Sequence, residues 1–403
     1  MRRNAVTTAR VATDRSAGTA IDAMFAAVLA VLLAIGWAAN HFAALMPVIS
    51  DHQHLSAATL NAVFGVYAVG LLPGLLIGGR ISDALGRRSV AYAGSAGALA
   101  GTVAMLLSQH SGVLLVGRLI VGVGVGLAIS SCTAWASDLK GPGGAATAGA
   151  VLTAGFAIGP FAGGIIGTAG QRGVEASFLV AAALVVLAAV ATVVAVHRAA
   201  APKPVTAIGR QQATSGQHGA ARALSWAMPL APWVFASATL AFVTIPTRLH
   251  TGLAAPVAAG TAALIVNGAS GSIQVLARLR RWGPQTGTVG ASLAAVGYAL
   301  AATAPRTMTV EMGVPLLVVL GCASGLCLRE GLIDLEAAAP KRSRGAITGV
   351  FYAVTYIGFG LPLLLTTIGY GVAAMLLGAM AVLAAATAVS RAVRLRRDSH
   401  RQR

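Results

Sequence analysis

The chain has 403 residues, of which 57% are hydrophobic and only 10% are charged. An average soluble domain carries about 25% charged residues, so this composition excludes an ordinary soluble protein. Glycine is abundant, at 49 residues, as is common where membrane helices approach one another closely. We therefore expect a protein whose main solvent is the lipid bilayer.

Apolar runs of about 20 residues, each long enough to cross a bilayer, recur along the whole chain. They lie at residues 21–49, 57–79, 89–109, 113–136, 146–169, 175–197, 226–249, 255–277, 285–304, 311–329, 346–369 and 371–390. These twelve runs predict an all-α membrane protein. Cys132, Cys322 and Cys327 fall inside the runs and are too few for a disulfide framework or a metal site. We expect neither a metal nor a cofactor.

The net charge of +18 is distributed in a way that predicts the orientation of the helices. Twenty-five of the 29 lysines and arginines fall in the two tails and in alternate loops; the others are Arg118, Arg172, Arg248 and Arg306. By the positive-inside rule, this bias puts both termini in the cytoplasm. The sequence offers no basic patch on a soluble face, so we do not expect a nucleic-acid partner.

A polar stretch divides the predicted helices into two sets of six. Residues 198–225, RAAAPKPVTAIGRQQATSGQHGAARALS, have the composition of a linker. We expect a cytoplasmic tail at 1–20, one bundle at 21–197, a second bundle at 226–390 and a basic tail at 391–403. Faint echoes between the halves, such as GAATAG before the fifth run and GAITG before the eleventh, are typical of transporters made of two related bundles.

The first run carries a polar group inside an apolar helix. Trp37, Asn40 and His41 lie at i, i+3 and i+4, so they share one face. A polar pair at this depth is costly without a partner or a wet cavity. It either bonds to a neighbouring helix or lines a central substrate cavity, where His41 could also titrate near neutral pH. Further candidates for the cavity wall are Asn61, Tyr67, Asn267 and Gln274.

The bend after the second run, IGGRISDALGRRS, concentrates charge. Gly79 and Asp83 lie four residues apart, on one helix face. Gly86 permits a tight turn, and Arg87 and Arg88 begin the next helix. Charge bias explains the arginines but not Asp83, which opposes it. A carboxylate here can be held by the arginines and by the positive N-terminal end of a neighbouring helix.

Glycines step along one face of the fourth and fifth runs. In the fourth run Arg118 precedes a face of small residues at four-residue intervals, and it either snorkels to the interface or faces a partner inside the protein. The fifth run reads AGFAIGPFAGGIIG, which predicts a groove for another helix and a proline bend. Its motif residues are Gly155, Gly159, Pro160, Gly163 and Gly164.

Together these motifs resemble those of the major facilitator superfamily. The charged bend is similar to the family's G-x-x-x-D-[R/K]-x-G-[R/x]-[R/K] signature, although Ala84 replaces the usual basic residue. In the family this motif latches the cytoplasmic side against the eleventh helix, here near Gly345–Thr348. The arginine at 118 resembles the R-x-x-x-G-x-G arginine of proton-coupled drug antiporters, and residues 155–164 resemble the antiporter signature G-x-x-x-G-P-x-x-G-G of the drug-efflux branches.

The resemblance implies a twelve-helix secondary transporter that exports drugs or amphiphilic molecules in exchange for protons. It also implies a monomer in a bacterial inner membrane, with a small-molecule substrate as its partner. No Asp or Glu lies at the centre of a predicted run, so proton coupling would rest on Arg118, His41 or Asp22. An importer or facilitator of a small metabolite is the alternative; a transport-dead sensor or a membrane enzyme is more remote, and we do not expect an enzyme.

Overall fold

A computed structural model describes residues 2–198, 217–338 and 344–401. The helices are α1 (Arg2–Gln53), α2 (Ala57–Leu85), α3 (Arg87–Leu107), α4 (Ser111–Gly167), α5 (Gln171–Arg198), α6 (Gln217–Ala227), α7 (Ala231–Thr239), α8 (Ala255–Leu279), α9 (Thr286–Thr303), α10 (Val310–Ala338), α11 (Arg344–Ile357), α12 (Leu361–Thr367) and α13 (Tyr370–Arg401). Short 3-10 or π turns join some of them: η1 (Met228–Leu230), η2 (Leu240–Thr244), η3 (Ile245–Arg248) and η4 (Gly358–Gly360). Two short strands, β1 (Leu249–His250) and β2 (Met308–Thr309), pair in parallel.

Eleven helical segments of the described chain are long and apolar enough to cross a membrane. The long helix α4 supplies two of them, Ser111–Gly141 and Gly143–Gly167. The remaining expected helix is α9, whose 18 residues include several glycines and threonines that dilute its apolar character. It nevertheless packs against α10 and α13. The predicted all-α membrane fold is confirmed.

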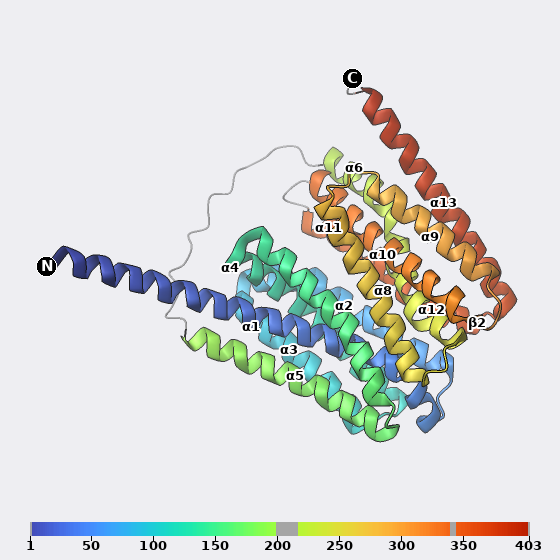
Figure 1. Cartoon of the computed structure of the whole chain (residues 1–403), viewed down its shortest axis with the longest axis horizontal. Helices are drawn as coiled ribbons and strands as arrows, with labels where there is room; N and C mark the ends of the chain where they lie inside the picture. Colours follow the sequence, from blue (N-terminus) through green and yellow to red (C-terminus); the bar gives the residue numbers. More distant parts are fainter. Residues whose placement is uncertain (1, 199–216, 339–343, 402–403) are drawn as a thin grey trace.

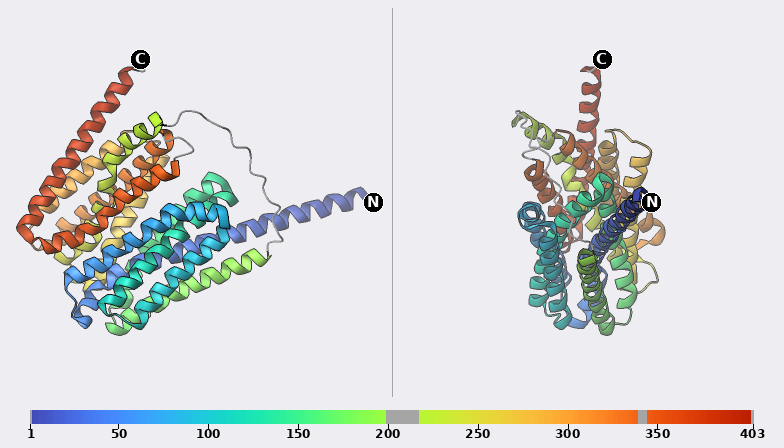
Figure 2. Two further views of the ribbon diagram at one scale, coloured as in Figure 1. Left: turned by 180° about the vertical axis from the view of Figure 1, so that it is seen from behind. Right: turned by 90° about the vertical axis from the view of Figure 1, so that its left-hand side faces the viewer.

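The helices form two groups, which Figure 1 shows side by side. We call α1–α5 the N-half and α6–α13 the C-half. The first and last helices project from the same end of the molecule (Figure 2). We call this the terminal end, where α2 ends at Leu85, and the opposite end the far end, where α1 ends at Gln53. The charge bias predicts that the terminal end faces the cytoplasm.

Several predicted segment boundaries do not coincide with ends of helices. The helix α1 begins at Arg2, inside the expected tail, and α13 continues to Arg401. Arg391, placed at the start of the basic tail, is a buried helix residue. Two carboxylates neutralise it, which a count of apolar residues cannot detect. Of the predicted linker, residues 199–216 lie outside the described residues, and α6 begins at Gln217.

The two halves meet through two sets of helices. The helix α2 contacts α11, η4 and α12, and both α1 and α4 contact α8. Aromatic side chains fill the first contact, where the ring of Phe64 in α2 stacks on that of Phe359 in η4 with centroids 5.3 Å apart. Small residues form the second contact, as described next. These contacts position the candidate site between the halves.

Candidate functional site

The glycine motif of α4 receives the backbone of α1. A Cβ placed on Gly155 would lie 3.0 Å from the Cα of Gly36, and one on Gly159 would lie 2.8 Å from the Cα of Trp37. Real Cβ atoms do not approach backbone this closely, so larger residues would force the helices apart. Gly163 continues this face toward His41, whose Cβ would lie 3.3 Å away. The three glycines therefore bind α1 within the N-half.

The remaining motif residues face the C-half. A Cβ on Gly164 would collide with the carbonyl oxygen of Pro256, the second residue of α8. In the other direction, a Cβ on Gly260 of α8 would collide with the carbonyl oxygen of Pro160 and lie 3.0 Å from the Cα of Phe161. The sequence predicts one groove for one helix. The structure instead gives the motif two faces, one for α1 and one for α8.

Two predicted binding residues converge on the carbonyl oxygen of Phe156, inside this motif. The Nδ2 of Asn40 in α1 and the Nδ2 of Asn267 in α8 each donate to this oxygen at 3.4 Å. Asn267 also donates to the carbonyl of Ala263 in its own helix at 2.9 Å. Trp37, half-buried beside Asn40, has an indole nitrogen with no partner among the described residues. These groups come from both halves and meet at one point.

Arg118 lies inside the N-half and does not snorkel. The side chain is fully buried, and its Nη1 donates to the carbonyl oxygen of Ala39 in α1 at 2.7 Å. Its guanidinium carbon lies 4.4 Å from the ring centroid of Tyr67 and 5.0 Å from that of Phe42. Its Nε and Nη2 have no partner among the described residues. Cation–π contacts with desolvated rings, about 2 kcal/mol each, offset part of the cost of burying this charge.

His41 occupies a different place from the cavity wall that the sequence suggests. It is fully buried, and its ring meets that of Phe178 in α5 edge-on with centroids 5.1 Å apart. Its Nδ1 lies 3.1 Å from the carbonyl oxygen of Trp37, and its Nε2 has no partner among the described residues. Although Asn40 and His41 are adjacent, only Asn40 reaches the Phe156 carbonyl to which Asn267 of the C-half also donates. This geometry favours the alternative in which His41 bonds within the N-half.

The other predicted lining residues are dispersed. Tyr67 packs under Arg118 and is near Phe359, with ring centroids 6.1 Å apart. Asn61, closer to the far end, donates from Nδ2 to the hydroxyl of Thr366 in the C-half at 3.5 Å, and its Oδ1 has no partner in the described chain. Gln274 lies two helical turns from Asn267 toward the terminal end, and its Nε2 donates to the hydroxyl of Ser270 in the same helix at 3.4 Å.

The charged bend forms an ion-pair network at the terminal end. Arg87 pairs with Asp83 one turn before it, and its Nε lies 3.0 Å from Oδ2 of Asp138 at the end of the first α4 span. Gly86, with a φ of 91°, makes the tight turn. We call Asp83, Arg87 and Asp138 the N-half cluster. The ion pairs of Asp83 and Asp138 join α2, α3 and the first α4 span; the expected contact of Asp83 with the start of α11, near Gly345–Thr348, stays a prediction.

The other residues of the predicted latch and proton path lie around this cluster. Arg88 stacks over the ring of Trp135, with its guanidinium carbon 5.9 Å from the centroid. Gly79 has open space around it rather than a neighbouring helix. Asp22 pairs with Lys140 at the terminal end and is 64% exposed. An exposed carboxylate so far from Arg118 is poorly placed to carry a buried proton.

A family comparison agrees with this architecture. The model of the Major Facilitator Superfamily matches residues 26–362, which run from within α1 to the start of α12. This chain belongs to the Major Facilitator Superfamily. It is therefore a multi-pass membrane transporter and not an enzyme.

Similarity to individual superfamily members is partial in sequence and broad in fold. The multidrug resistance protein MdtL of Escherichia coli (strain UTI89 / UPEC) is 33% identical over 81 residues, which are 20% of this chain and 21% of MdtL. The MdtL of Shigella flexneri serotype 5b is 35% identical over a stretch of the same length. The chain thus matches about a fifth of the length of these relatives.

Solved structures show the fold alone, because their sequences are distant. A peptide transporter POT in complex with sulfate has a TM-score of 0.73 at 13% identity, covering 92% of this chain and 94% of that one. A D-xylose-proton symporter has a TM-score of 0.69 at 16% identity, covering 91% and 97%. Superfamily members with different cargoes share this fold, so cargo has to be inferred from the residues of the site.

Sequence reasoning missed a second ion cluster of this superfamily member, at the terminal end of the C-half. Arg391 of α13 lies 2.7 Å from Oδ2 of Asp334 and 3.3 Å from Oε1 of Glu330, both in α10. It also donates to the carbonyl oxygens of Trp226 and Pro284 at 3.2 and 3.4 Å. We call Glu330, Asp334 and Arg391 the C-half cluster. The sequence does contain a signal for this cluster: Glu330 and Asp334 lie four residues apart on one helix face, and Arg391 directly follows the last apolar run.

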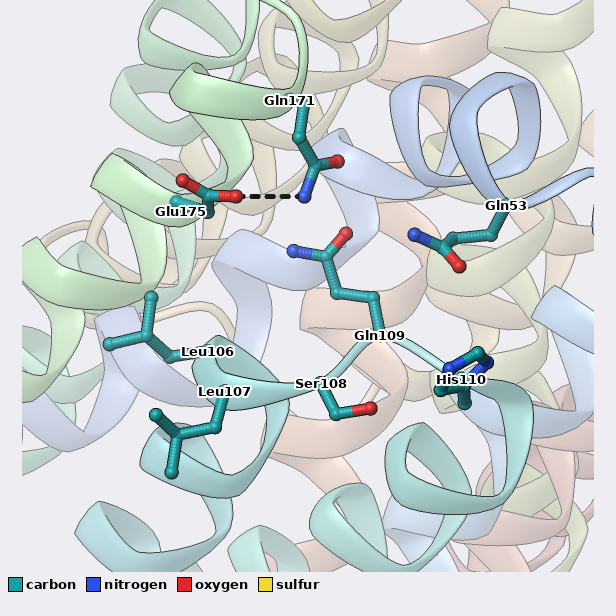
Figure 3. Close-up of a pocket in the computed structure, with 8 residues that line it drawn as sticks. All are labelled: Gln53, Leu106, Leu107, Ser108, Gln109, His110, Gln171 and Glu175. Carbon is teal, nitrogen blue, oxygen red and sulfur yellow. Dashed lines mark hydrogen bonds between the residues drawn. The ribbon is translucent and has the colours of Figure 1, made fainter.

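The structure also contains a polar pocket at the far end of the N-half, and Figure 3 shows the side chains that line it. Its volume is about 240 Å³, and it lies between the ends of α1 and α3 and the start of α5. Gln171 donates to Glu175 at 3.0 Å, while the side-chain oxygens of Gln171 and Gln109 are buried without a partner among the described residues. The pocket has room for water beside these acceptors. None of the predicted site residues lines it.

Proposed function

We propose that this transporter exports amphiphilic small molecules in exchange for protons. The observation that carries the proposal is the bond between Asn267 of the C-half and the Phe156 carbonyl, inside the antiporter-like motif of the N-half. Alternating access requires the two halves to move against each other, so a polar contact between them at mid-membrane must break and re-form. Cargo that hydrogen-bonds to these amides competes for the same groups.

The composition of the site indicates the class of cargo. Aromatic rings of α2, η4 and α7 lie at the contact between the halves, and Trp37 lies near Asn40. Arg118 adds a buried positive charge that no carboxylate of the described chain pairs. A cationic cargo would be repelled at low dielectric, whereas a neutral or weakly acidic one would not. We therefore propose neutral or weakly acidic aromatic amphiphiles.

His41 and Arg118 together suggest a route for the proton. Both bond to carbonyls of one turn of α1, those of Trp37 and Ala39, and the same turn carries Asn40. The unpartnered Nε2 of His41 is available to accept a proton. A second cation on this turn would repel Arg118 and displace the turn, and with it Asn40. Proton binding and cargo binding would then be linked through one helical turn.

An uncoupled facilitator is the second candidate function. It is favoured by the positions of the carboxylates in the described spans, which lie toward the ends of the helices. Asp22, Asp83, Asp138, Glu330 and Asp334 lie toward the terminal end, and Asp51, Glu175 and Glu311 lie toward the far end. Many proton-coupled transporters use a buried carboxylate nearer the centre. If His41 does not take a proton, cargo moves only down its own gradient.

The test uses everted membrane vesicles with an acid interior and a pH-sensitive dye, to which a panel of aromatic amphiphiles is added. We expect neutral and weakly acidic compounds to collapse the gradient. Gly159→Val should abolish the response because its side chain meets Trp37, whereas Gly149→Val, in open space on the same helix, should not. His41→Gln should retain cargo binding and lose proton movement. Cargo flux without any proton movement in the unmodified protein would establish the facilitator instead.

A further inference from the structure

Two arginines at the far end of the C-half share one aromatic ring. The guanidinium carbons of Arg248, at the end of η3, and Arg306, after α9, lie 5.4 and 5.0 Å from the ring centroid of Tyr370 in α13. Arg248 donates to the carbonyl oxygens of Ala304 and Pro305 at 3.0 and 2.7 Å, and the hydroxyl of Tyr370 donates to Ala304 at 2.6 Å. Three separate segments are thus held together around two positive charges.

These charges lack an anionic partner. None of the ion pairs within the described residues includes Arg248 or Arg306. Arg248 and Arg306 are also two of the four basic residues of the chain that do not follow the charge bias toward the terminal end. Like charges held near one ring repel each other, and the arrangement is stabilised when an anion lies between them. The pair therefore has the electrostatics of an anion site.

A cavity of about 240 Å³ opens beside Arg248 and Tyr370. Its walls are mainly apolar and include Leu365, Ala373 and Leu377. Two buried polar atoms that belong to lining residues, Nε of Arg248 and Oγ1 of Thr244, have no partner among the described residues. The site thus combines unpaired donors and positive charge with an apolar interior. A free inorganic anion would use the donors and leave the apolar walls unfilled.

The location matches the headgroup layer of a membrane. Arg248 ends one candidate span and Tyr370 begins another. Tyrosine and arginine are common at this depth, and guanidinium groups bind phosphate oxygens with two parallel hydrogen bonds. We propose that Arg248, Arg306 and Tyr370 bind the phosphate of an anionic phospholipid, with part of an acyl chain in the adjoining cavity. The site is separate from the cargo site and independent of the transport direction.

The experiment measures lipid retained by the full chain, purified in detergent, by native mass spectrometry. Phosphatidylglycerol, phosphatidylcholine and inorganic phosphate serve as the probes. We expect one tightly retained phosphatidylglycerol per chain, and about tenfold weaker retention in Arg248→Gln/Arg306→Gln, because charge-assisted bonds are lost. The control is Arg172→Gln, which matches Arg306→Gln by removing one positive charge at the far end, next to Gln171 of the polar pocket.

A second variant separates the acyl chain from the phosphate. Leu377→Trp fills the cavity while both arginines remain, and it should also weaken retention of phosphatidylglycerol. If the double variant does not fold, Arg306→Gln alone serves, because this side chain is exposed and contacts the ring of Tyr370 without a hydrogen bond to any described residue. Equal retention in the arginine variants and the control would overturn the proposal. Displacement of the lipid by millimolar inorganic phosphate, or equal binding of phosphatidylcholine, would overturn the assignment to an anionic lipid.

Discussion

The two ion clusters at the terminal end have the same charges in different surroundings. In each, one arginine lies between two carboxylates at the end of a long helix. The side chains of the N-half cluster are accessible, with Asp83 65% and Asp138 57% exposed. Those of the C-half cluster are enclosed, with Arg391 4% and Glu330 3% exposed. Arg87 lies one turn after one of its carboxylates, Asp83, whereas Arg391 comes from the last helix, 57 residues after Asp334.

This difference suggests different roles for two equivalent corners. An exposed ion pair gives little stability, because water and salt compete for both charges. Such a pair can exchange partners at low cost, as a reversible latch must. A buried pair cannot lose one partner without leaving an uncompensated charge. We therefore expect the N-half cluster to control conformation and the C-half cluster to hold α10 and α13 together.

The largest expected effect comes from Arg391→Leu. It leaves the partly buried Asp334 without its arginine and the buried Glu330 with the longer pair to Arg329 at 3.5 Å, and we expect the free energy of unfolding to fall by about 3–5 kcal/mol. Equilibrium unfolding in detergent measures this loss. The control is Arg394→Leu one turn later, which removes a charge that bonds only to Ser225 and stacks on Trp226. If both variants unfold alike, the C-half cluster is not a stabilising element.

Neutralising the whole C-half cluster should cost much less than breaking it. Glu330→Gln/Asp334→Asn/Arg391→Met removes all three charges of the cluster together. Only Arg329, whose side chain is 18% exposed, loses its carboxylate, so we expect stability within about 2 kcal/mol of the original protein. Transport should be retained, because the cluster has no role in the conformational change. Cargo-driven dye responses in vesicles test the second point. A stable but transport-dead triple variant would contradict the division of roles.

Arg87→Ala should have the opposite effects, with a small loss of stability and a clear loss of transport. It removes both ion pairs of the N-half cluster, yet their exposure limits the stability loss to about 1 kcal/mol. We expect a several-fold fall in transport rate and a shift between the two conformations. Labelling of single cysteines on either side of the α2–α11 contact would report the shift. Unchanged labelling together with normal transport would show that the N-half cluster is only structural.

The smallest effect is expected from Ala84→Arg, which restores the basic residue usual in the family signature. It adds a charge beside Asp83 on an exposed turn, worth less than about 0.5 kcal/mol of stability. We expect a modest shift of the labelling pattern, opposite in sign to that of Arg87→Ala. A labelling shift of the same sign as that of Arg87→Ala would mean that the added arginine does not strengthen the ion pairing of Asp83.

Sequence periodicity predicted most of the fold but less of the site. The spans and the close-packed glycine motif followed from local composition, since each apolar run or glycine repeat specifies its own helix face. The partners of those faces did not follow. The second face of the motif at Gly164 depends on α8, some 90 residues away, and the environment of Arg118 depends on α1 and α2.

The sequence also did not reveal which charged side chains are buried. The predicted runs end at residues 329 and 390, just before Glu330 and Arg391, because hydropathy treats each charge as exposed. In the structure they neutralise each other, so α10 extends to Ala338 and α13 to Arg401. His41 shows a related limit. Sharing a helix face with Asn40 predicted a shared surface, but one step of about 100° separates adjacent residues on a helix and directs them to different neighbours.

Gly141 has a mechanical consequence. It alone interrupts the helical geometry of α4, with φ of 65° and ψ of −157°, a conformation that is essentially restricted to glycine. The segment that carries Arg118 is therefore joined to the segment that carries the glycine motif by one pivot rather than by a loop. No loop residues separate the two segments. A tilt of one segment therefore either changes the backbone angles at Gly141 or tilts the other segment. A displacement of the helix segment around Arg118 is thus mechanically linked to a displacement of the glycine motif that contacts α8.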